Sequence, residues 1–228
     1  MFYNASYLLW VFLPTMLLTL YAQWRVKSAY AKWSQVANER GINGMQTAQL
    51  IMRDTGLDHI EVRRTPGFLT DHYDPRDKSI NLSEGSTAPS IAAMAIVAHE
   101  LGHAEQDKVG STMLNLRASL VPVANLGSGL GMWLIFGGLM LNMTGLAWTG
   151  VALFGAMVLF TLVTLPVEFD ASRRAKRNLQ RLNLVSTTEA KGVNAVLDAA
   201  ALTYVAAAAG AVINLLYYVS LLSGRSRD

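Results

Sequence analysis

The sequence lacks cysteine, which excludes disulfide bonds, thiolate metal sites and a cysteine nucleophile. Charged residues are also scarce, at 15% of the 228 residues, whereas soluble domains carry about 25%. The net charge is only +3, and the basic residues stand beside apolar runs. We therefore interpret the positive excess as charge at a membrane edge and expect no nucleic-acid partner.

Three stretches contain no charged residue at all, namely residues 1–24, 118–167 and 199–224. A transmembrane helix needs about 20 mostly apolar residues. The first and last stretches are long enough for one helix each, and the middle stretch for two helices joined by a turn at "LNMTG" (141–145). The sequence therefore predicts a mainly α-helical integral membrane protein with about four transmembrane helices.

These stretches also predict how the chain is organised. We expect a single membrane-embedded unit with transmembrane helices over 5–23, 118–141, 146–167 and 199–222. Between them we expect a small α+β part over 24–117 with a helix over 90–107, and a further helix and loop over 168–198. Within the small part, residues 24–40 have the periodicity of an amphipathic helix. Lys and Arg flank the spans on the side of 24–117 and 168–198, so the positive-inside rule places both segments in the cytoplasm.

Residues 98–106 read "AHELGHAEQ" and contain the motif H-E-x-x-H. On a helix, His99 and His103 stand one above the other and can bind one metal ion. Glu100 lies about 100° around the helix, within reach of a water molecule on that ion. Because zinc lowers the pKa of bound water to about 7, we expect Glu100 to act as general base. It would take the proton of the attacking water and pass it to the leaving amine.

A catalytic zinc ion needs a third protein ligand, and no histidine follows the motif at a suitable spacing. The candidates are the carboxylates of Glu168 and Asp170 in "LPVEFDASRRAKR" (165–177). We favour Glu168, which is expected to begin a helix that leaves the membrane, because a carboxylate near the membrane needs a neutralising partner. The alternative is that Glu168 complements the dipole of that helix.

The residues around Glu168 are assigned by helical spacing. Asp170 lies about 200° around the helix from Glu168, so the two carboxylates do not easily face one ion. Ser172 shares the face of Glu168 and is a candidate for supporting the site from outside the ligand set. Asp170 remains a second candidate for that supporting role.

The segment "DHYDPR" (71–76) has two interpretations. Asp-Pro flanked by polar residues is ordinary turn chemistry. His72 and Tyr73 are candidates for contacts with the substrate or the transition state. The following residues 78–83 are a candidate edge strand that could pair with an extended substrate.

Taken together, four segments resemble the YugP-like neutral zinc metallopeptidases of bacterial membranes. They are "GFLTDHYDPRDKSINLSEG", "SIAAMAIVAHELGHAEQ", "LPVEFDASRRAKRNL" and "VLDAAALTYVAAAAGAVINLLYY". The resemblance implies a membrane-embedded zinc peptidase whose small α+β catalytic part is zincin-like, with its zinc motif at His99, Glu100 and His103. The chain is more distantly similar to the membrane zincins of the HtpX and CAAX-protease type, whose second motif begins with a liganding Glu, here Glu168. The Asp that those enzymes carry four residues later is replaced by Ser172.

We therefore predict a membrane zinc-dependent endopeptidase with a Glu third ligand and one Zn²⁺ per chain. Its partners would be the lipid bilayer and a protein or peptide substrate, with membrane proteins among the candidates. We expect it in the bacterial inner membrane with the active site on the cytoplasmic side. Two alternatives stay open: a metal-dependent hydrolase of a non-peptide substrate, and a non-catalytic membrane scaffold stabilised by metal. An intact Glu100 argues against the scaffold, because a structural metal site has no need of a base.

Overall fold

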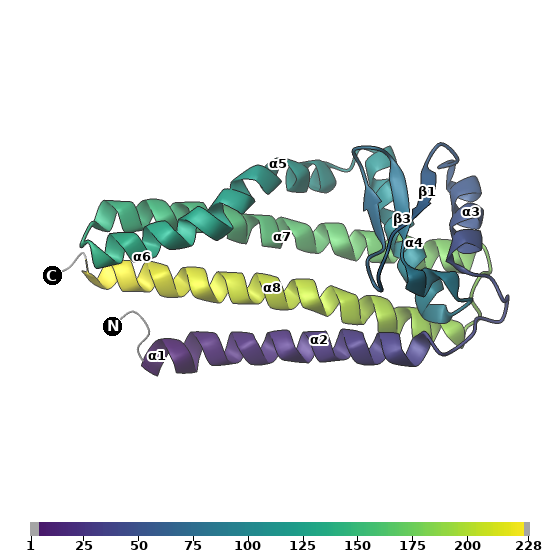
Figure 1. The fold of residues 1–228 in the computed structure, drawn as a ribbon, viewed down its shortest axis with the longest axis horizontal. Coiled ribbons are helices and arrows are strands. Elements are labelled where there is room, and N and C mark those ends of the chain that lie inside the picture. Colours follow the sequence, from purple (N-terminus) through teal and green to yellow (C-terminus); the bar gives the residue numbers. More distant parts are fainter. Residues whose placement is uncertain (1–4, 226–228) are drawn as a thin grey trace. The chain divides into compact units, whose positions relative to one another are not determined.

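The computed structural model describes residues 5–225, without the side chain of Arg225 (Figure 1). It confirms the predicted fold class, a mainly helical chain with four long apolar helices and a small three-stranded sheet. By length and composition, the helices that can cross a membrane are Ala5–Trp33, Thr112–Met140, Thr144–Arg181 and Glu189–Gly224. The chain divides into two compact units, which are described separately below.

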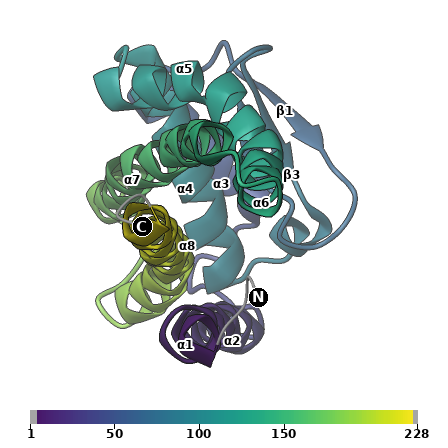
Figure 2. The same cartoon turned by 90° about the vertical axis from the view of Figure 1, so that its left-hand side faces the viewer.

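The first unit, called the apolar unit, comprises the chain up to Ala22, Thr112–Pro166 and the part from Thr203 onward. Its elements are α1 (Ala5–Tyr7), the π-helix η1 (Leu8–Phe12), the start of α2 (Leu13–Trp33), α5 (Thr112–Leu126), the π-helix η3 (Gly127–Gly131), α6 (Met132–Met140), and parts of α7 (Thr144–Arg181) and α8 (Glu189–Arg225). Figure 2 shows α2 and α8 nearly end-on. An apolar core joins α6, α7 and α8 and consists of Ile135, Leu139, Ala147, Val151, Phe154, Val158, Tyr218 and Leu222.

The second unit, called the mixed unit, comprises Gln23–Ser111 and Val167–Leu202. It contains α3 (Gly44–Thr55), β1 (Glu61–Arg64), β2 (His72–Asp74), β3 (Ser79–Leu82), the 3-10 helix η2 (Glu84–Thr87) and α4 (Ile91–Lys108), with the remaining parts of α2, α7 and α8. The sheet order is β1-β3-β2, with β1 parallel and β2 antiparallel to β3. Ile80 and Leu82 of β3 join the buried side chains of α3 and α4 in one core.

The strand order corrects the prediction for residues 78–83. Because β3 pairs on both sides, it is the central strand and cannot add a substrate strand. The free edges of this sheet belong to β1 and β2.

The predicted helix over 24–40 is also wrong at its C-terminal end, since α2 ends at Trp33. The backbone after Trp33 pairs instead with the residues just before α4. Ala37 forms a bridge with Ser90, and the amide of Ile91 donates to the carbonyl of Val36 over 3.0 Å. These tertiary hydrogen bonds replace the helical ones that the periodicity favours.

The helix expected to begin at Glu168 is instead part of α7, which runs unbroken from Thr144 to Arg181. Pro166 lies inside this helix and removes one backbone donor without ending it. Glu168 therefore does not lie at a helix N-terminus, and its place is not explained by a helix dipole.

Candidate active site

Helix α4 carries the H-E-x-x-H motif in the mixed unit. The helix begins where the Ser90 side chain accepts a hydrogen bond from the amide of Ala93 over 3.1 Å, which caps an otherwise unpaired donor. Its first turns are almost fully buried. His99 and His103 follow one turn apart, and their side chains are only 13% and 12% exposed.

The structure brings Glu168 of α7 to these two histidines. Nε2 of His99 lies 3.2 Å from Oε2 of Glu168, and Nε2 of His103 lies 3.5 Å from the same oxygen. One ligand atom from each of the three residues lies within 4.8 Å of the others. Glu168 itself is only 2% exposed. The Glu168 carboxylate is buried and faces two imidazoles. Burial of a carboxylate costs free energy unless a positive charge, such as a metal ion, lies beside it.

The distances from the Glu168 oxygen to the two imidazole nitrogens fit zinc. Bonds of about 2.0–2.2 Å in a tetrahedron place neighbouring ligand atoms about 3.3–3.6 Å apart, close to the observed 3.2 and 3.5 Å. Two imidazoles and one carboxylate are also a known set for a catalytic zinc ion, which keeps its fourth position open. His99, His103 and Glu168 can therefore hold such an ion.

Helix α4 approaches α7 closely because residue 102 is glycine. A Cβ atom at Gly102 would collide with the carbonyl oxygen of Ala171 and would come within 3.0 Å of its Cα atom. The missing side chain lets the helix that carries the histidines reach the helix that carries Glu168.

Glu100 lies beside the ligand cluster and is held by β2. The backbone amide of Tyr73 donates a hydrogen bond to Oε2 of Glu100 over 3.0 Å. Within residues 5–225, no further protein hydrogen bond reaches the other carboxylate oxygen. Burial raises the pKa of the Glu100 carboxyl, although the nearby histidines oppose that rise. A carboxylate with a raised pKa is a better proton acceptor near neutral pH.

The two candidates in the DHYDPR segment point to opposite faces of the sheet, as neighbours on a strand do. The Tyr73 side chain faces α4, where its hydroxyl donates to Asp107, so only its backbone reaches Glu100. Burial, followed by the contact with Asp107, raises the pKa of this phenol. His72 is exposed, with Nδ1 2.9 Å from the carbonyl of Thr70. The structure therefore does not bring His72 to the cluster.

Other side chains contact the outer nitrogens of the two histidines. The Ser172 hydroxyl lies 3.1 Å from Nδ1 of His99. Nδ1 of His103 lies 3.0 Å from Oε1 of Gln106, and Gln106 in turn contacts Asp170. Asp170 is thus two contacts away from His103, outside the ligand cluster. Sequence reasoning missed Gln106, whose only signal is its position three residues after His103 on the motif's helix.

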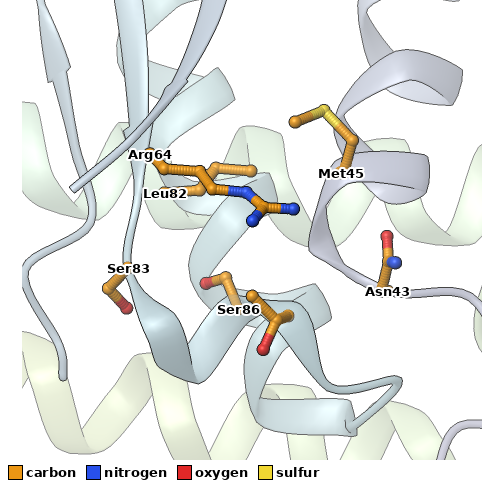
Figure 3. Close-up of a pocket in the computed structure, with 7 residues that line it drawn as sticks. Asn43, Met45, Arg64, Leu82, Ser83 and Ser86 are labelled. Atoms are coloured by element: carbon orange, nitrogen blue, oxygen red, sulfur yellow. The ribbon is translucent and has the colours of Figure 1, made fainter. Parts of the chain in front are cut away.

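A separate pocket of about 50 Å³ lies near the end of β1 (Figure 3). It is lined by Asn43, Met45, Arg64, Leu82, Ser83, Ser86 and Thr87. None of the predicted site residues lines this pocket, so it plays no part in the arrangement around Glu168.

Comparison with known proteins identifies the family of the chain. The family described as "Putative neutral zinc metallopeptidase" matches residues 8–223. The chain is also 42% identical over 213 residues to "Putative membrane protease YugP" of Bacillus subtilis (strain 168), covering 92% of this chain and 95% of that protein. No solved structure matches the chain. The resemblance to the YugP-like neutral zinc metallopeptidases is thereby confirmed.

Proposed function

Because the chain belongs to the neutral zinc metallopeptidase family, we propose that it is a membrane zinc-dependent endopeptidase. The observation that carries this proposal is the convergence of His99, His103 and Glu168 in the protein interior, with Glu100 beside them. These three residues would hold one Zn²⁺ per chain. Bound there, zinc would lower the pKa of a water molecule and polarise the carbonyl of the substrate.

The remaining chemistry belongs to Glu100. Its Oε2 is fixed by the Tyr73 amide, so its Oε1 can accept the proton of the attacking water. The same carboxyl then donates that proton to the nitrogen of the leaving group. Ser172 at Nδ1 of His99 keeps that ring turned with Nε2 toward Glu168.

The placement of β2 favours a peptide as substrate. This strand lies at the edge of the sheet, and the amide of its central residue, Tyr73, points at Glu100. An extended peptide that pairs with this edge would bring its carbonyls beside the proton acceptor. In this proposal β2 takes the role first considered for residues 78–83.

The four apolar helices and the distribution of Lys and Arg suggest where the reaction takes place. We propose that the chain works as one unit in the bacterial inner membrane, with the mixed unit in the cytoplasm. Membrane proteins with cytoplasmic segments would then be within reach as substrates.

Mass spectrometry of detergent-purified protein tests the ligand set. We expect about one zinc per chain in the wild type and loss of this zinc in Glu168→Ala. Glu61→Ala on β1 is the matched control, since it removes an exposed carboxylate outside the cluster, and it should retain zinc. Absence of zinc from the wild type, or its retention in Glu168→Ala, would contradict the proposal.

A further inference from the structure

Gln106 is a polar side chain enclosed almost completely by protein, with 1% of its surface exposed. All three of its hydrogen bonds go to groups at the proposed metal centre or next to it. Its Oε1 faces Nδ1 of His103 over 3.0 Å. Its Nε2 donates to the carbonyl of Val167 over 2.8 Å and to the carboxylate of Asp170 over 3.0 Å. Gln106 of α4 is therefore hydrogen-bonded to α7 at Val167, the residue before Glu168.

The partners of Gln106 determine which way its amide points. A backbone carbonyl can only accept a hydrogen bond, and so can a carboxylate. Asp170 also accepts a hydrogen bond from Nε of Arg174 over 2.7 Å, as an ionised carboxylate does. The NH₂ group of Gln106 must therefore face Val167 and Asp170, which leaves its oxygen facing His103.

This orientation in turn determines the form of His103. An amide oxygen only accepts, so the imidazole nitrogen that faces it must carry a hydrogen. With hydrogen on Nδ1, a neutral ring has its lone pair on Nε2. Nε2 is the nitrogen that faces Glu168, 3.5 Å from Oε2.

We propose that Asp170 and Gln106 form a relay that positions His103 as a metal ligand. Asp170 orients the amide of Gln106, and Gln106 keeps the hydrogen of His103 on Nδ1 and the lone pair on Nε2. The hydrogen bond from Gln106 to the Val167 carbonyl holds the α7 backbone there. Glu168, the next residue, is thereby kept facing Nε2 of His103. The proposal rests on the proposed metal site and gives Asp170 a positioning role in place of a ligand role.

If Gln106 only tied α4 to α7, its replacement would change stability but not the tautomer of His103. Loss of an interhelical tie lowers stability wherever it occurs, but it does not select one tautomer of a histidine. The tautomer can be measured in the metal-free protein by ¹⁵N NMR with labelled histidine, because the chain has only 4 histidines. The measurement is made at alkaline pH, where the ring is neutral, because an imidazolium carries hydrogen on both nitrogens and has no tautomer. Zinc affinity is measured separately, by competition with a chelator of known affinity.

The main variant is Gln106→Met, which keeps much of the volume but neither accepts from His103 nor donates to α7. In the wild type we expect His103 as the Nδ1–H tautomer. In Gln106→Met we expect a mixture of tautomers and a zinc affinity about 10- to 100-fold lower. The same substitution at exposed Gln180 of α7 is the control and should change neither quantity.

Asp170→Asn provides a second test that does not depend on the stability of Gln106→Met. The Val167 carbonyl still holds the Gln106 amide in that variant, so we expect partial loss of the single tautomer and an affinity loss below about 10-fold. If both variants keep the wild-type tautomer and zinc affinity, the relay is refuted while the metal site stands. If the wild type binds no zinc, the proposed function fails, and the NMR measurement on the metal-free protein still decides on the relay.

Discussion

Replacement of Glu100 by Gln should leave zinc in place and abolish hydrolysis. The amide has nearly the shape of the carboxylate, and its oxygen can still accept the hydrogen bond from the Tyr73 amide. It cannot take a proton from water, however, so we expect cleavage of fluorescein-labelled casein to fall by about 10²- to 10⁴-fold. Metal content by mass spectrometry and casein cleavage in detergent are measured on the same preparation.

The control for this variant is Glu61→Gln on β1, the same substitution at an exposed carboxylate. It should retain both zinc and activity. Unchanged casein cleavage in Glu100→Gln would exclude Glu100 as the base. Cleavage of lipid esters but not of casein by the wild type would favour the non-peptide hydrolase instead.

Gly102→Ala should have the largest effect on the assembly of the site. The added methyl group meets the Ala171 backbone, which cannot move aside as a flexible side chain would. Overpacking of this kind costs about 1–3 kcal/mol. Because the clash separates the helix of His99 and His103 from the helix of Glu168, we also expect zinc affinity to fall by at least about 10-fold. Thermal unfolding in detergent and chelator competition measure the two effects.

Gly155→Ala is the matched control, since Gly155 also lies in a helix but has open space where a Cβ atom would be. Alanine is the better helix former by about 1 kcal/mol, so this variant should be at least as stable as the wild type. A melting temperature and zinc affinity for Gly102→Ala equal to those of Gly155→Ala would show that α4 and α7 can separate without harm to the site.

The parts of this molecule that the sequence could predict depend on local regularity. The apolar helices follow from the length of their uncharged stretches. His99, Glu100 and His103 form a recognisable group because helical spacing alone brings the histidines to one face. Glu168 could be singled out because a carboxylate after a long uncharged stretch calls for a partner.

The parts that could not be predicted depend on contacts between distant segments. The hydrogen bond from Gln106 to Val167 joins residues 61 positions apart. Nothing in the sequence near Gln106, a neutral side chain beside the motif, indicates this contact. Residues 34–40 lose their helical form to backbone hydrogen bonds with the entry to α4. Likewise, the run of basic residues that contains Arg174 is typical of a solvent-exposed surface. In the structure, however, Arg174 forms ion pairs with Asp170 of α7 and Glu105 of α4.

The distribution of the proposed ligands along the chain has a consequence for biosynthesis. His99 and Glu168 lie 69 positions apart, and a ribosome that adds about 5–20 residues per second needs roughly 3–14 s to extend the chain from one to the other. The intervening segment includes the uncharged stretch from 118 to 167. A nascent chain with both histidines but no Glu168 lacks a complete metal centre. In the proposed mechanism, proteolytic capacity would thus arise only after Glu168 of α7 has been added to the chain.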